Sequence, residues 1–223
     1  MQTTRPKQTT PPDSTKSVDE YHRSDLPAGY SSERPLRHAS VLIPVLNHNG
    51  NWKVLYIRRS QSKHDRHSGQ VAFPGGAHEQ DDADPIATAL RETHEEIGIS
   101  SDNIRVLHTL PEYETVSYFR VTPVVGILNW PTTMKLQSSE VARAFTIPLE
   151  WLLDESNYSF RDRPESKSAN TPPGKRPLIV YFKEYDGEIL WGASARITLN
   201  FLLALRTGSL LIPGFSPGTP NHN

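Results

Sequence analysis

Apolar positions of the chain gather into runs from Ala39 onward, and the first two runs predict a β-hairpin. Residues 41–46 and 52–57 are rich in Val, Leu and Ile, and Asn49-Gly50 between them is a pair that tight hairpin turns favour. Apolar runs at 104–110, 119–128 and 142–147 predict three further strands. A second hairpin is predicted from residues 178–185 and 189–191, which Asp186-Gly187 joins.

A helical period replaces alternation in three places. The clearest helix is predicted to begin after Asp84, an N-cap residue followed by Pro85, and to end before Gly98, a C′ residue. Its predicted core face carries Ile86, Ala89, Leu90, Thr93 and Ile97. A short helix at 148–154 and a final helix at 193–206 complete the pattern. Strands and helices mix without strict alternation, which predicts an α/β fold with a mixed sheet flanked by helices.

Polar and Pro-rich segments divide the chain. Residues 1–38 are aperiodic and are predicted to form a disordered arm before a single domain at 39–206, with a C-terminal tail at 207–223. Residues 155–177 are rich in Ser, Pro and charge and are predicted to be a long loop. Trp191, just before the final helix, is predicted to be a core residue.

Composition excludes several classes of function. The chain has no cysteine, so disulfide scaffolds, Cys-ligated zinc, iron–sulfur clusters and thiol nucleophiles are excluded. With 24 Lys+Arg against 25 Asp+Glu, the net charge does not suggest a nucleic-acid partner. The apolar runs are shorter than the roughly 18 residues of a spanning helix, so no membrane association is expected. We expect a cytoplasmic protein, with a mitochondrial transit peptide as the alternative; monomer and homodimer both remain open.

Three carboxylates lie on one arc of the helix predicted after Asp84. Glu92, Glu95 and Glu96 are spaced so that their side chains reach one region, and their like charges repel one another. A solvated acidic face is one interpretation. The other is a site for a hard divalent cation such as Mg²⁺, which binds carboxylate oxygens and removes the repulsion.

The residues around this arc resemble the Nudix box. Gly76-x5-Asp82-x8-Arg91-Glu92-Thr93-x-Glu95-Glu96-x-Gly98-Ile99 departs from that pattern by an Asp in place of Glu at 82 and by one extra residue before Arg91. The resemblance implies a Nudix-type α/β/α sandwich that hydrolyses nucleoside diphosphate derivatives with Mg²⁺ or Mn²⁺. It also implies that Glu92 and Glu96 are the principal metal ligands, that Glu95 is a further ligand or a base, and that Arg91 orients the carboxylates. The role of Asp82 stays open.

The segment just upstream resembles the coenzyme A pyrophosphatase branch of that family. The resemblance rests on Leu55-Tyr56-Ile57-Arg58-Arg59-Ser60, on Gly69 and on Phe73-Pro74-Gly75-Gly76. It implies hydrolysis of coenzyme A or acyl-coenzyme A, a small-molecule substrate, to 3′,5′-ADP and (acyl-)4′-phosphopantetheine. The candidate substrate-binding residues are Arg59, Arg66, Gly75 and Gly76, and Arg66 is displaced by one position from the signature.

The sequence leaves three questions open. Glu140 is either a catalytic base or a surface carboxylate. An alternative substrate is ADP-ribose, NADH or another nucleoside diphosphate derivative. A non-catalytic module that binds nucleotides is a third alternative, although such modules usually lose box carboxylates that are present here.

Overall fold

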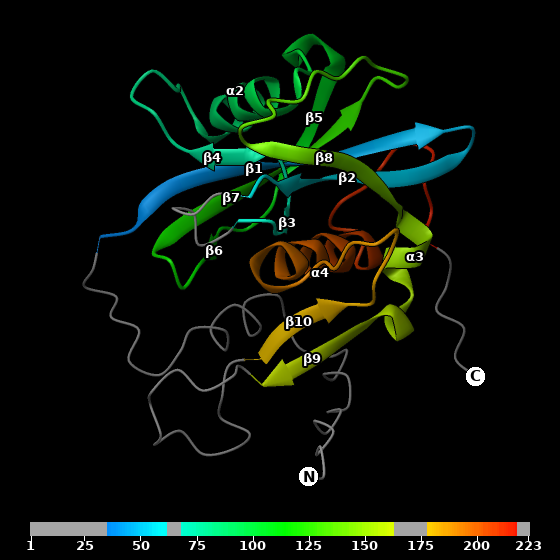
Figure 1. The fold of residues 1–223 in the computed structure, drawn as a ribbon. Coiled ribbons are helices and arrows are strands. Elements are labelled where there is room, and N and C mark those ends of the chain that lie inside the picture. Colours follow the sequence, from blue (N-terminus) through cyan, green and yellow to red (C-terminus); the bar gives the residue numbers. More distant parts are fainter. Residues whose placement is uncertain (1–34, 62–67, 163–177, 218–223) are drawn as a thin grey trace, which may run out of the picture.

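The computed structural model describes residues 35–61, 68–162 and 178–217, so the predicted arm lies outside the described residues except for its last four positions. One large mixed sheet organises this part of the chain (Figure 1). Its strands follow the order β3-β2-β1-β7-β5, while β4 pairs with β1, β6 with β7 and β8 with β2. The strands are β1 (Arg37–His48), β2 (Asn51–Arg59), β3 (Val71–Ala72), β4 (Gly75–Ala77), β5 (Ile104–Thr109), β6 (Tyr113–Glu114), β7 (Phe119–Leu128) and β8 (Val141–Pro148).

The predicted first hairpin is present, and it forms the centre of this sheet. β1 and β2 pair antiparallel from Val45↔Val54 to His48↔Asn51, and both Asn49 and Gly50 have positive φ angles, as the tight turn requires. On its other side β1 pairs with β7 in parallel. The sheet is therefore mixed, as the pattern of strands and helices predicts.

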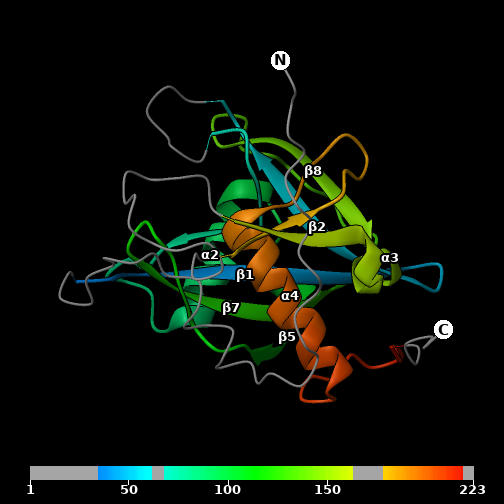
Figure 2. The ribbon, with the colours of Figure 1, turned by 90° about the horizontal axis from the view of Figure 1, so that it is seen from below.

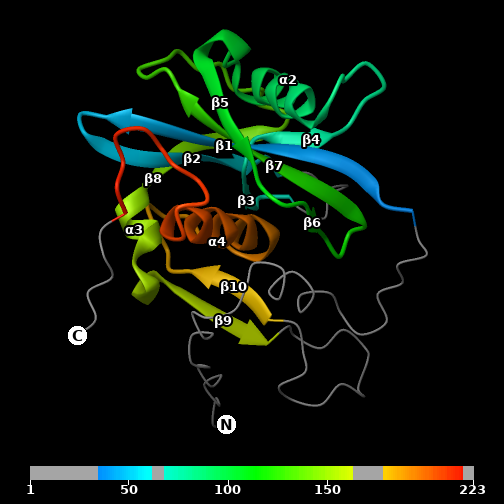
Figure 3. The same cartoon turned by 180° about the vertical axis from the view of Figure 1, so that it is seen from behind.

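Helices cover both faces of the sheet, in agreement with the predicted α/β/α sandwich (Figures 1 and 3). α2 (Pro85–Ile97) packs on a cluster of aliphatic residues that includes Leu42, Leu55 and Ile57. The residues that alternate with these on the strands face α4 (Gly192–Arg206), which runs across the opposite face (Figure 2). α3 (Leu149–Leu153) and two 3₁₀ turns, η1 (Ser101–Asn103) and η2 (Glu155–Asn157), complete the described helices.

The prediction of one loop over 155–177 is wrong for its first part. Tyr158–Asp162 is a strand, β9, which pairs antiparallel with β10 (Leu178–Phe182) from Tyr158↔Phe182 to Asp162↔Leu178. This small sheet packs against α4 on the side away from the main sheet (Figure 1). The predicted second hairpin is correspondingly reduced to two isolated bridges, Tyr185↔Glu188 and Tyr181↔Trp191.

The segments just before and just after α4 differ from their predicted roles as core residue and tail. Trp191, predicted to be a core residue, is 37% exposed and stacks on the Tyr181 ring at an interplanar angle of 7°. After α4, Leu210 and Ile212 are buried, and Phe215 lies edge-on to Trp52 at the tip of the β1–β2 hairpin. The start of the predicted tail therefore packs against the domain.

No helix in the described parts of the chain is long and apolar enough to cross a membrane.

Candidate active site

The helix that carries the acidic arc begins and ends at the predicted residues. The Asp84 side chain accepts a hydrogen bond from the Ala87 N–H at 2.8 Å, Pro85 occupies the first turn, and Gly98 adopts the left-handed conformation that ends α2. Ala89, Thr93 and Ile97 are buried against the sheet. Thr93 fits its apolar surroundings because its hydroxyl donates to the Ala89 carbonyl at 2.7 Å.

Burial separates the three glutamates, which the sequence places together on one polar arc. The Glu95 side chain is 55% exposed, the Glu92 side chain is 15% exposed and the Glu96 side chain is only 2% exposed. Glu96 therefore lies between α2 and the sheet, and Glu92 lies at the margin of this contact. The interpretation of a uniformly solvated acidic face is wrong for Glu96.

Two glycines make room for these carboxylates. The Gly75 N–H donates to Glu96 Oε2 at 3.0 Å, and the φ angle of Gly75 is +155°, which disfavours any residue with a Cβ. A Cβ on Gly76 would lie 2.4 Å from Glu92 Oε1. Gly75 and Gly76, predicted as substrate-binding residues, thus lie against the Glu96 and Glu92 carboxylates, and their lack of side chains lets these groups approach β4.

Arg91 and Asp82 hold the preceding loop on the helix. Arg91 Nε and Nη2 donate to the two carboxylate oxygens of Asp82 at 2.9 and 3.0 Å, and Nη2 also donates to the Ala77 carbonyl. Arg91 Nη1 lies 3.1 Å from both Glu92 and Glu95. Arg91 therefore contacts both Glu92 and Glu95, two of the carboxylates that it is predicted to orient.

Asp82, whose role the sequence left open, is the main hydrogen-bond acceptor for Arg91. Its carboxylate also accepts hydrogen bonds from the Thr88 hydroxyl and the Glu79 N–H. These bonds, the strongest of them from Arg91, hold the pKa of Asp82 well below its usual range. Sequence reasoning also missed Thr88, and its position one turn into the helix beyond Asp84 is the signal that could have indicated it.

Burial near the sheet disfavours the charged forms of Glu92 and Glu96. Burial raises the pKa of Glu96 to about 7, and the nearby Glu92 and Glu140 charges add to this, while the Gly75 N–H and Arg59 oppose it. Burial also raises the pKa of Glu92, in opposition to the Arg91 guanidinium. A cation in this region would favour the charged forms of both groups.

Residues from β2 and from the segment before β8 complete the site. Arg59, the last residue of β2, places Nη1 3.8 Å from Glu96 Oε1. Glu140 is exposed, and its carbonyl accepts a hydrogen bond from the Ser60 N–H at 2.8 Å. The structure thus brings Arg59 and Glu140 to the same region as Glu96, while Arg66 lies outside the described residues.

The described residues suit a divalent cation that keeps part of its hydration. Among them, no three His, Asp or Glu side chains converge as a complete metal site, and Arg91 holds Glu95 at the surface. Mg²⁺ is commonly bound through one or two carboxylates, with waters and substrate phosphates as its other ligands. Glu92 and Glu96, one turn apart and crowded with like charge, fit that requirement.

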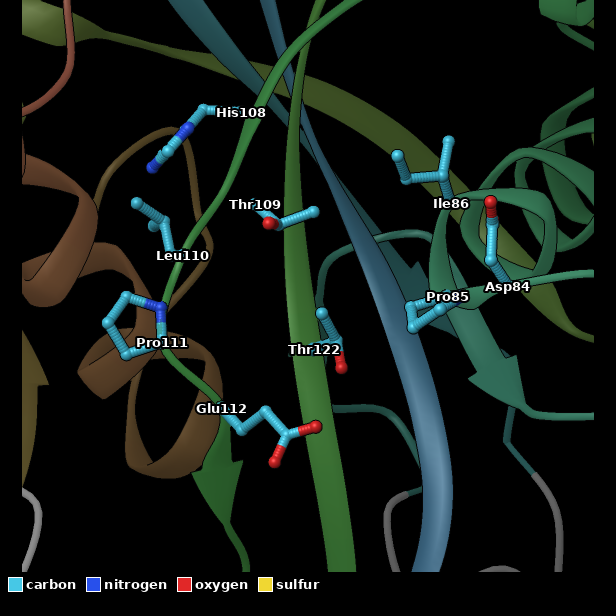
Figure 4. Close-up of a pocket in the computed structure, with 9 residues that line it drawn as sticks. All are labelled: Asp84, Pro85, Ile86, His108, Thr109, Leu110, Pro111, Glu112 and Thr122. Atoms are coloured by element: carbon cyan, nitrogen blue, oxygen red, sulfur yellow. The ribbon is translucent and has the colours of Figure 1, made fainter.

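A hollow of about 540 Å³ lies elsewhere, between the first turn of α2 and the β5–β7 region (Figure 4). Its lining includes Ile86, His108, Leu110, Glu112 and Thr122. None of the predicted site residues lines it, so we do not assign the carboxylate chemistry to this hollow.

The mixed sheet lies between helices, and the helix that carries the three glutamates packs against one face of it. A profile of the NUDIX domain matches residues 36–166. The chain belongs to the Nudix family, whose hydrolases generally use divalent metal ions.

Comparison with known proteins gives relatives over most of the chain. An uncharacterized Nudix hydrolase named NudL from Pectobacterium atrosepticum is 35% identical over 180 residues, which cover 81% of this chain and 88% of the relative. A protein of the same name from Enterobacter sp. is 36% identical, with 77% and 83% covered. A MutT/nudix family protein of solved structure from Enterococcus faecalis is 18% identical with a TM-score of 0.49, covering 87% of this chain and 70% of that protein.

Proposed function

We propose that this Nudix hydrolase cleaves the pyrophosphate of coenzyme A or an acyl derivative. The products would be 3′,5′-ADP and (acyl-)4′-phosphopantetheine. The observation that supports the proposal is that residues of the coenzyme A-type segment contact Glu96 of the Nudix box. Arg59 from the coenzyme A-type segment lies 3.8 Å from it, and the N–H of Gly75, which precedes the box, donates to it.

In this proposal Glu92 and Glu96 hold Mg²⁺ or Mn²⁺, and Glu95 is a further ligand or a base. A bound divalent ion lowers the pKa of a coordinated water and neutralises charge on the phosphates. Arg91 keeps Glu92 and Glu95 in place through its contacts of 3.1 Å. Glu140 is a candidate base because it is exposed and close enough to Glu96 to raise that group's pKa.

Arg59 is proposed to bind substrate phosphate. Its side chain is 31% exposed, and a guanidinium can donate two parallel hydrogen bonds to a phosphate. Coenzyme A carries a 3′-phosphate in addition to its pyrophosphate, so such a substrate presents more negative charge than ADP-ribose or NADH. Arg66, which lies outside the described residues, is proposed to contribute in the same way.

A turnover panel tests the substrate. Coenzyme A, acetyl-coenzyme A, dephospho-coenzyme A, ADP-ribose and NADH are compared at equal concentration with Mg²⁺ and with Mn²⁺, and products are separated by chromatography. We expect the highest kcat/KM on coenzyme A or its acetyl ester. A higher kcat/KM on ADP-ribose or NADH would reject the coenzyme A assignment and leave a Nudix pyrophosphatase of other specificity. No turnover of any substrate would favour a nucleotide-binding module.

A further inference from the structure

A buried carboxylate lies beneath the strand ends that carry part of the proposed site. The Glu188 side chain is 5% exposed, and its Oε1 lies 3.5 Å from Arg58 Nη1 and 3.1 Å from Arg143 Nη1. Arg143 also bonds the carbonyl and the carboxylate of Asp186. The tight turn at Asp186 and Gly187, both with positive φ angles, is thereby fastened to β2 and β8.

The two arginines of this contact form the last regular pair between β2 and β8. Arg58 and Arg143 are directly opposite each other in the antiparallel register, two residues beyond the pair Tyr56↔Phe145. Like charges directly opposite each other on one face of a sheet repel. Glu188 forms ion pairs with both guanidinium groups and offsets that repulsion at this pair.

The register shifts immediately after this pair. Arg59 pairs with Val141, so Ala142 is an extra residue on β8. Bulges of this kind change the direction in which the following side chains point. Beyond the bulge, the ends of β2 and β8 both lie at the proposed site. Arg59 extends to Glu96, and the carbonyl of Glu140, the residue before Val141, accepts a hydrogen bond from the Ser60 N–H.

We propose that Glu188 is a positioning residue, and that its pairing with Arg58 and Arg143 fixes the strand ends from which Arg59 and Glu140 reach the metal and phosphate region. Glu188 lies on the α4 side of the sheet and touches neither Glu92 nor Glu96 in the structure. It acts through the backbone at the bulge. This inference rests on the proposed function, since it assigns Arg59 and Glu140 to the reaction.

The test compares Glu188→Gln with a control change at the far end of α4, at a glutamate that is exposed and paired with one arginine. Glu155 pairs with Arg206 at 2.6 Å, so Glu155→Gln also removes a glutamate charge from an arginine, away from the site. For Glu188→Gln we expect kcat/KM on coenzyme A with Mg²⁺ to fall roughly tenfold. This is the lower end of the roughly 10- to 100-fold losses that follow removal of a residue that supports a metal site. Glu155→Gln should stay within about twofold of wild type, and Glu188→Asp, which keeps the charge, should recover part of the loss.

A second readout does not depend on activity. Hydrogen exchange of the Ser60 amide, which is bonded to Glu140, should become about tenfold faster in Glu188→Gln. Exchange of the Asn129 amide, which follows β7 and is bonded to the Asn103 carbonyl of η1, should not change and serves as the internal reference.

The two readouts separate the inference from the proposed function. If the wild type turns over no coenzyme A, the proposed function fails, and the exchange rate of Ser60 still decides whether Glu188 fixes the strand ends. Unchanged Ser60 exchange in Glu188→Gln would overturn the inference. So would equal losses of thermal stability in Glu188→Gln and Glu155→Gln with kcat/KM unaffected in both, because Glu188 would then be a structural ion pair alone.

Discussion

α2 and α4 lie on opposite faces of the same sheet, and the layers that they form with it differ in the side chains that fill them. The buried residues under α2 are aliphatic and few, and polar contacts of Arg91, Asp82 and Glu96 lie directly beside them. The core around α4 is larger and rich in aromatic rings. It includes Tyr56 and Phe145 of the main sheet, Phe201 of α4, and Phe160 and Phe182 of the small β9–β10 sheet on the other side of α4.

This difference separates stability from chemistry within one small domain. Buried apolar area is the main favourable term in folding, so the α4 layer supplies more of it. The α2 layer instead keeps a carboxylate at 2% exposure, which costs free energy unless the group is protonated, hydrogen-bonded or paired. Changes in the α4 core should therefore lower stability, whereas changes beside α2 should lower activity.

The largest expected effect is on the α4 side. Phe201 is fully buried, and Phe201→Ala should lower the free energy of unfolding by about 3–5 kcal/mol because it leaves a cavity in the aromatic core. Urea denaturation at 25 °C measures the change, and kcat of the folded fraction should stay within about twofold of wild type. A loss of kcat as large as that of a glutamate variant would remove the distinction between the two faces.

Next in size is a change in the α2 layer. Glu96→Gln should reduce kcat on the substrate identified by the turnover panel by at least about 100-fold, or about 2.7 kcal/mol of activation free energy, because it removes a proposed metal ligand. Circular dichroism should show an intact fold, and Glu155→Gln, on the other side of the sheet, is the control for loss of one glutamate charge. Turnover like that of wild type in folded Glu96→Gln would reject the metal-ligand assignment.

A smaller effect should distinguish substrates. Arg59→Ala should reduce kcat/KM on coenzyme A roughly 10- to 150-fold more than on dephospho-coenzyme A if Arg59 binds the 3′-phosphate, since a charge-assisted hydrogen bond contributes about 1.5–3 kcal/mol. Arg105→Ala, at an exposed position of β5, is the control for loss of one positive charge. Equal losses on both substrates would instead place Arg59 on the pyrophosphate.

The smallest expected effect is on stability in the α2 layer and depends on pH. Because hydrogen bonds from Arg91 lower the pKa of folded Asp82, its charged form stabilises the protein above the usual carboxyl pKa of about 4, and this contribution is lost as the pH falls below that value. Asp82→Asn should lower the free energy of unfolding at pH 7 by about 1–2 kcal/mol. Urea denaturation of the metal-free proteins at pH 7 and pH 3 measures this, and a difference that does not shrink at pH 3 would contradict it.

Local sequence signals determined much of this protein. Asp84, Pro85 and Gly98 set the limits of α2, and Asn49-Gly50 set the first hairpin, because caps and tight turns depend on residues a few positions apart. The order of residues in the box likewise indicated the family, because its spacing is that of one loop and one helix. Each of these features involves contacts within a short stretch of chain.

Tertiary structure decided how deeply each of three neighbouring glutamates is buried. Glu95 and Glu96 are adjacent in sequence, and the helical period places Glu96 beside the core position Ala89, but the cover that buries Glu96 almost completely comes from Gly75 and the sheet. Tertiary structure also decided that β9 is a strand. Tyr158 and Phe160 alternate with polar residues over a stretch too short to predict a strand, and the partner strand β10 lies well beyond β9 in sequence. The position of Arg59 beside Glu96 and the contact of Glu188 with two strands also join distant segments. Burial and long-range pairing depend on what the rest of the chain places nearby, so no local pattern specifies them.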